Sequence, residues 1–76
     1  METVIYHTEV DCSQLFIYVN YLFMDSKGTV LKHKSLKLDY DRDYSEESNL
    51  KDIPGIILND LTRESIKCDK PQIIKL

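Results

Sequence analysis

The stretch Leu15–Met24, which reads Leu-Phe-Ile-Tyr-Val-Asn-Tyr-Leu-Phe-Met, decides the fold of this chain. A helix is one interpretation, because Asp11 and Gln14 just before it have the spacing of a capping box. The stretch is nevertheless dense in β-branched and aromatic residues, which suit a pleated surface better than a helix. We therefore interpret it as a strand.

The residues that follow support a hairpin. Residues 25–28 read Asp-Ser-Lys-Gly, in which the Asp side chain can bond to the turn backbone and the glycine can adopt positive φ. Residues 29–40 are again strand-like, so we predict a long hairpin of residues 14–24 and 29–40. In the second strand Lys32 and Lys34 share a face with Leu36 and Leu38. We expect a bulge near Lys34-Ser35, because one face would otherwise be wet at one end and buried at the other.

Three further elements complete the expected fold. Residues 3–10 alternate as a half-buried strand does. Residues 53–64 are typical of a helix with Asp52 as N-cap, Pro54 in the first turn, an isoleucine and leucine stripe, and Asn59, Asp60, Arg63 and Glu64 on the opposite side. The tail after residue 65 alternates around Pro71, which indicates an edge strand.

The order β-β-β-α-β predicts a single α+β domain over residues 1–76. Its small antiparallel sheet of about four strands carries one helix on one face. No apolar run is long enough to span a bilayer. The acidic start and the two separate cysteines, Cys12 and Cys68, are typical of a cytoplasmic protein with free thiols.

An acidic tract is the sharpest functional signal. Residues 39–52 hold six acidic and two basic side chains, in a chain whose formal net charge is −3. Alternating carboxylates in an extended segment lie about 6.5–7 Å apart, close to the phosphate spacing of a nucleic-acid strand. Such a tract can occupy a basic cleft on another protein, and the alternative is a solvated loop that maintains solubility. Ser45 is expected to cap a single helical turn within the tract. The candidate binding residues are Asp39, Tyr40, Asp41, Asp43, Tyr44, Glu46 and Glu47.

A second signal is surplus apolar surface. Both faces of Leu15–Met24 are apolar, and a single three-turn helix can cover only one of them. Either the loop and tail fold over the other face, or a partner covers it. We assign Phe16, Tyr18 and Leu22 as candidate partner-binding residues.

Other classes of function have weaker support. His7, Glu9 and Asp11 share one strand face, but a polar row on a wet face explains them without a metal. No nucleophile pair, phosphate-binding glycine loop or catalytic elbow is present, so we expect neither enzymatic activity nor a cofactor. Lys32, Lys34 and Lys37 beside tyrosines favour a small nucleic-acid-binding domain, but the acidic net charge argues against direct binding.

These signals together predict a non-enzymatic protein-binding module that docks on a larger protein with a basic cleft. In general character the chain is similar to small acidic phage inhibitors of nucleic-acid enzymes, a likeness of composition without a shared motif. Its amino acids follow codons rich in A and T, and it contains no alanine. The resemblance implies a phage or mobile-element protein in the host cytoplasm that inhibits a nucleic-acid-handling protein. The alternative is a homodimer that pairs sheet face to sheet face or edge to edge.

Overall fold

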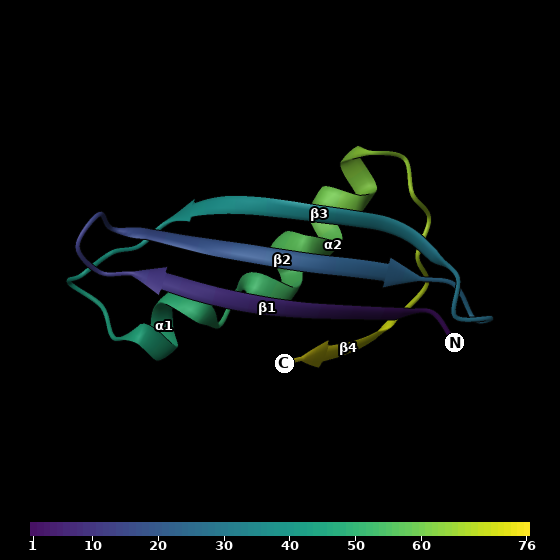
Figure 1. Ribbon diagram of the computed structural model, residues 1–76, viewed down its shortest axis with the longest axis horizontal. Coiled ribbons are helices and arrows are strands. Elements are labelled where there is room, and N and C mark those ends of the chain that lie inside the picture. The colour runs from purple at the N-terminus through teal and green to yellow at the C-terminus, as the bar shows by residue number, and fades with distance from the viewer.

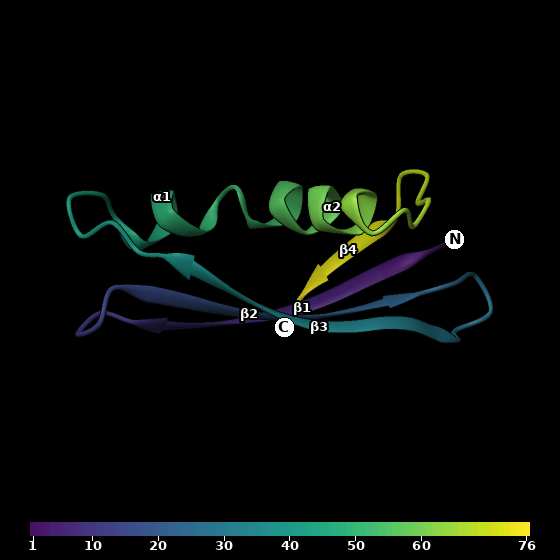
Figure 2. The ribbon, with the colours of Figure 1, turned by 90° about the horizontal axis from the view of Figure 1, so that it is seen from above.

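The computed structural model describes residues 1–76 and shows a four-stranded sheet with two helices on one side (Figures 1 and 2). The elements are β1 (Thr3–Asp11), β2 (Phe16–Met24), β3 (Val30–Asp39), α1 (Glu46–Leu50), α2 (Ile53–Arg63) and β4 (Gln72–Lys75). The α+β class and the order β-β-β-α-β are confirmed. The expected helical turn is α1, and the hydroxyl of Ser45 accepts the amide hydrogen of Ser48 at its start.

The strands lie in the order β3-β2-β1-β4. The first three strands are antiparallel neighbours, whereas β4 runs parallel to β1, so the sheet is mixed and not wholly antiparallel. The reason is the crossover: β3 and β4 run in the same direction, because α2 returns the chain along the sheet before β4 begins. Residues 66–69 form no strand, so only the second half of the tail joins the sheet.

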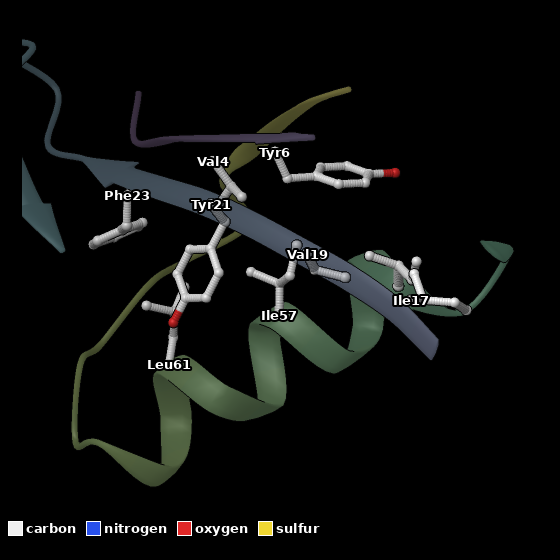
Figure 3. Packing of buried hydrophobic residues seen from close by; sticks show 9 residues of the cluster. Val4, Tyr6, Ile17, Val19, Tyr21, Phe23, Ile57 and Leu61 are labelled. Atoms are coloured by element: carbon white, nitrogen blue, oxygen red, sulfur yellow. The ribbon is translucent and has the colours of Figure 1, made fainter. Parts of the chain in front are cut away.

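The core lies between the sheet and α2 (Figure 3). Side chains on alternate positions of β1 and β2 point to this side, where α2 contributes one stripe. The buried residues are Val4, Tyr6, Ile17, Val19, Tyr21, Phe23, Ile53, Ile57 and Leu61. Of the predicted helix stripe Ile53, Ile56, Ile57 and Leu61, all but Ile56 belong to this core; Ile56 is half-buried and lies outside the cluster.

The predicted bulge at Lys34-Ser35 is wrong. The pairing of β2 and β3 is regular there, and its only register shift lies between Phe23 and Met24, which pair with Lys32 and Val30. Lys32, Lys34, Leu36 and Leu38 therefore all face the helix side. The lysines are accommodated there because α2 places carboxylates over them. The strand therefore needs no bulge to turn them toward solvent.

The positions of those carboxylates also differ from the sequence prediction for α2. Asp60 was expected on the solvent side of α2, but it is only 4% exposed. Its Oδ2 accepts a 2.6 Å hydrogen bond from the Tyr21 hydroxyl, and its Oδ1 lies 3.0 Å from the Lys34 ammonium nitrogen. Glu64 pairs with Lys32 at 2.9 Å. Asp52 precedes α2 as expected, although its side chain makes no capping hydrogen bond.

The tight turn between β2 and β3 follows the sequence prediction. Oδ1 of Asp25 accepts the amide hydrogens of Lys27 and Thr29, both at 2.9 Å. Gly28 has a φ of +87°, a conformation that other residues rarely adopt. The long hairpin of residues 14–24 and 29–40 is confirmed.

Candidate protein-binding surfaces

The side of the sheet that faces away from α2 has no segment of the chain over it (Figure 2). We call this side the open face. Because side chains alternate along strands, it carries the residues that are not in the core. Its apolar members are Ile5, Phe16, Tyr18, Leu22, Met24, Val30 and Ile74, and its polar members are Thr3, His7, Glu9, Asp11, Asn20, His33, Ser35, Lys37, Asp39 and Gln72. The expected surplus of apolar β-surface is therefore present.

The centre of the open face is organised by contacts between strands. Ser35 on β3 donates a hydrogen bond to the side-chain oxygen of Asn20 on β2. The Lys37 ammonium nitrogen lies 3.8 Å from the centre of the Phe16 ring, a cation–π contact. The rings of Phe16 and Tyr18 are 6.5 Å apart. These contacts hold the aromatic side chains in place with no covering segment.

A shallow hollow of about 150 Å³ marks the region between β1 and β3. It is lined on the open face by Ile5, His7, Asn20, Leu22, His33 and Leu76. At the rim of the face, Val30 is 50% exposed and Ile74 is 38% exposed. Leu22, which the sequence singled out, therefore lies in the hollow, and the apolar surface extends beyond the three residues predicted.

The accessible surface of the chain agrees with an uncovered face. It amounts to 5279 Å², whereas a folded monomer of 8.9 kDa exposes roughly 4,800 Å². The molecule measures 40 × 20 × 16 Å, so part of the excess comes from its elongated shape. The rest fits a sheet that is packed on one side only.

The predicted acidic residues gather at one end of the molecule, where β3 ends and α1 begins (Figure 1). We call Asp39, Asp41, Asp43, Glu46 and Glu47 the acidic surface; all five are exposed. The backbone amide of Tyr40 donates to the carbonyl of Leu15, which ties this end of β3 to the β1–β2 turn. The charges are thus held beside the sheet and not on a free loop.

Asn49 fixes the shape of this segment. Its side-chain oxygen accepts the amide hydrogen of Asp41 at 2.8 Å, and its side-chain nitrogen donates to the carbonyls of Asp41 and Ser45. Asp41 in turn accepts the amide hydrogen of Asp43 at 2.9 Å. Asp41 therefore has a structural role, whereas Asp43, Glu46 and Glu47 make no hydrogen bond or ion pair through their side chains.

The two tyrosines of the tract differ. Tyr44 is 64% exposed and is available to a partner. Tyr40 is half-buried and packs against the core. Its pKa is raised above the usual value, chiefly by desolvation and further by the neighbouring Cys12 and Glu46. Tyr40 therefore anchors the acidic segment to the core, and only part of its side chain is accessible to a partner.

The two candidate surfaces meet only at Asp39. Asp39 pairs with Phe16 in the sheet and so lies on the open face. The remaining acidic residues belong to the loop and α1, which lie in the helix layer on the other side of the sheet (Figure 2). The sequence could not show this division, because it depends on which side of the sheet the chain crosses after β3.

The lysines of β3 lie on both sides of the sheet. Lys34 lies 3.0 Å from Asp60 and 3.4 Å from Glu64, and its hydrogen bond to Asp60 is the main reason that its pKa is raised. Lys32 is paired with Glu64 on the same side. Lys37 is on the open face instead. The lysine-rich strand therefore does not present its charges on one surface.

No metal centre or cysteine pair is formed. No group of three or more His, Cys, Asp or Glu side chains lies close enough to hold a metal ion. His7, Glu9 and Asp11 form the expected row along the open face of β1. Cys12 is exposed, Cys68 is half-buried, and both are free thiols.

Comparison with known proteins gives no match for this chain. Its sequence matches no family model and no curated protein, and its fold matches no solved structure. None of its helices has the length and apolar character needed to cross a membrane.

Proposed function

We propose that this chain is a non-enzymatic protein-binding module that docks on a larger protein with a basic cleft. Its most concrete form is a small acidic inhibitor, of phage or mobile-element type, that acts on a nucleic-acid-handling protein in the host cytoplasm. The observation that carries the proposal is the exposed acidic surface, held in a fixed shape by Asn49 and Asp41 beside an open apolar face.

The acidic surface attracts a basic partner and orients it. Asp43, Glu46 and Glu47 have no partners within the chain, so their charges are available to lysines and arginines of another protein. Complementary charge of this kind accelerates association and selects the partner. Tyr44 adds an exposed aromatic ring, the type of residue that anchors protein interfaces.

The open face supplies apolar contact area near the same end. Phe16 and Tyr18 lie close to Asp39, where the open face and the acidic surface meet. A partner that reaches around this end of the sheet contacts both. Burial of aromatic side chains then adds affinity that salt does not screen.

The proposal is tested by affinity capture from lysate of the source host, with quantitative mass spectrometry over a range of salt concentrations. The variant Glu46→Gln/Glu47→Gln removes two charges of the acidic surface. We expect it to capture the partner at least about tenfold less efficiently and with a weaker dependence on salt.

The matched control is Glu2→Gln/Asp69→Asn, which changes the net charge equally near the start of β1, away from the acidic surface. We expect capture by this variant to equal that of the wild type. If both variants capture the same protein equally well, the acidic surface is only a solubility feature and the proposal fails.

A further inference from the structure

One row of the open face has a self-complementary arrangement of charge. Tyr18 on β2 pairs with Glu9 on β1 and with Lys37 on β3, so an acid and a base flank the same aromatic ring. The two charged residues are two strands apart, roughly 10 Å, and none of the ion pairs of the chain involves either of them. Glu9 makes no hydrogen bond or ion pair within the chain, and Lys37 makes only its cation–π contact with the Phe16 ring, so both charges can pair with a second copy.

We infer that a second copy of this chain covers the open face, with the two-fold axis along the mean direction of the two β2 strands. A face-to-face pair needs its axis in the plane between the sheets. An axis along β2 places β1 of each copy over β3 of the other. Glu9 of each copy then faces the partner copy's Lys37, and Tyr18 and Leu22 meet their own equivalents. The inference rests on the proposed role of the open face as an interface. It assigns the central rows, with Tyr18, to the second copy and leaves only the Phe16 end beside Asp39 to a basic partner.

The distances suit this arrangement. Packed sheets lie about 10 Å apart, a gap that a glutamate and a lysine can bridge together. The end row, in which Asp11 and Asp39 flank Phe16, brings acids of the two copies toward each other. Because packed sheets are rotated by about −30°, β2 of each copy lies roughly 15° from the axis, so this end row diverges while the central rows stay in contact. Asp11 is also turned into its own loop by hydrogen bonds from Ser13 and Gln14.

The area of the open face limits this contact to a weak dimer. Three strands of about nine residues present a footprint of roughly 430 Å² per copy. Two copies together approach the roughly 1,000 Å² that a specific interface needs. We therefore expect a dimer that dissociates on dilution.

An edge-to-edge dimer is less well supported. The outer edge of β3 is unpaired, but the strand carries three lysines, Lys32, Lys34 and Lys37. Lysines on an edge strand oppose pairing with another strand. The face is also where the uncovered aromatic residues lie.

The dimer leaves the acidic surface free. Most of that surface lies in the helix layer, on the outer side of each copy (Figure 2). With the axis along β2, the two acidic surfaces point toward the same end of the pair. A basic partner would therefore meet two acidic surfaces instead of one.

The test is sedimentation equilibrium of the full chain from low micromolar to millimolar concentration. We expect the average mass to rise from 8.9 kDa toward twice that value. The single variants Glu9→Lys and Lys37→Glu each place like charges opposite one another, and we expect each to weaken the dimer at least about tenfold. The double variant Glu9→Lys/Lys37→Glu exchanges the two charges and should restore the dimer to within about threefold.

The matched control is Asp69→Lys, which changes the net charge as Glu9→Lys does but lies in the exposed loop before β4, outside the open face and the acidic surface. It should leave the dimer unchanged, and thermal melts should show that every variant is folded. A wild-type chain that stays monomeric at all concentrations overturns the inference. So does a dimer whose dissociation constant is unchanged in the single variants Glu9→Lys and Lys37→Glu. Neither result touches the proposed function, which depends on Glu46 and Glu47 and fails only in the capture experiment.

Discussion

The hydroxyl of Tyr21, in the middle of β2, donates a 2.6 Å hydrogen bond to the carboxylate of Asp60 on α2 (Figure 3 shows the tyrosine ring reaching toward the helix). The same carboxylate contacts Lys34 on β3 at 3.0 Å. One buried acid therefore joins two strands to the helix. This connection fixes how far along the sheet α2 lies, which apolar contacts alone specify less sharply.

We predict that Tyr21→Phe lowers the free energy of unfolding by about 1–3 kcal/mol, because it leaves Oδ2 of buried Asp60 without its donor. Urea denaturation checks this. Tyr18→Phe is the matched control, since the Tyr18 hydroxyl makes no hydrogen bond within the chain. Equal effects of the two substitutions would show that the buried hydrogen bond contributes nothing.

We predict that stability falls in acid because of Asp60. Burial by itself raises the pKa of this carboxyl, but hydrogen bonds from Tyr21 and Lys34 and the charge of Arg63 outweigh it, so the pKa lies below its usual value of 3.8. A group whose pKa is lowered on folding stabilises the fold above its unfolded pKa and loses that effect as pH falls through its folded pKa. The free energy of unfolding should therefore decrease below about pH 4, and the decrease should be smaller in Asp60→Asn.

At alkaline pH, we predict that the free energy of unfolding decreases as the pH rises, because of Tyr21. Desolvation, followed by the hydrogen bond to Asp60, raises the pKa of Tyr21 above its usual value of 10.0. The folded state therefore holds this proton more tightly than the unfolded state, so stability is complete below about pH 10 and declines above it. Denaturation measured at pH 9 and pH 11 checks this. Tyr21→Phe should remove part of the decline, and an unchanged decline would contradict the assignment.

We predict a strong asymmetry between the two sides of the sheet. Ile57→Ala should cost about 2–5 kcal/mol, because this side chain is fully buried between α2 and the sheet. Leu22→Ala on the open face should cost no more than about 1 kcal/mol in dilute protein, since this side chain is only half-buried. Chemical denaturation at low protein concentration compares the two. A comparable loss at Leu22 would mean that the open face is covered within a single chain.

We predict that Asn49 maintains the shape of the acidic surface. Asn49→Ala removes the hydrogen bonds to Asp41 and Ser45, and the Asp41 amide should then exchange its hydrogen with solvent more rapidly. Hydrogen exchange followed by NMR measures this. Ser48→Ala is the control, because the Ser48 side chain makes no hydrogen bond. If the Asp41 amide exchanges at the same rate in both variants, Asn49 is not the organising residue.

Local chemistry made much of the fold predictable. The β-branched and aromatic run of β2, the Asp25 and Gly28 turn, and the isoleucine stripe of α2 are short-range signals that act within a few residues. The strand and the turn are confirmed, and the helix stripe is confirmed except at Ile56, which lies outside the core cluster. The expected N-cap at Ser45 depends on the same kind of local signal.

The errors involve residues whose role depends on distant partners. Asp60 and Lys34 are charged, so periodicity assigns the aspartate to solvent and makes the lysine interrupt a buried strand face. They are 26 positions apart and stabilise each other only after α2 has crossed the sheet. No local pattern in the sequence shows that pairing. Without it, Lys34 had to be placed in solvent, and this led to the wrong prediction of a bulge.

The amino-acid sequence by itself determined that β2 has two apolar faces and that one short helix cannot cover both, because that follows from counting side chains of known size. It also determined where negative charge is concentrated. Only the tertiary structure decided that β4 runs parallel to β1, that the acidic surface and the open face lie in different layers, and that Glu9 and Lys37 flank Tyr18. These relationships depend on chain crossover and strand register, which arise from packing between segments far apart along the chain.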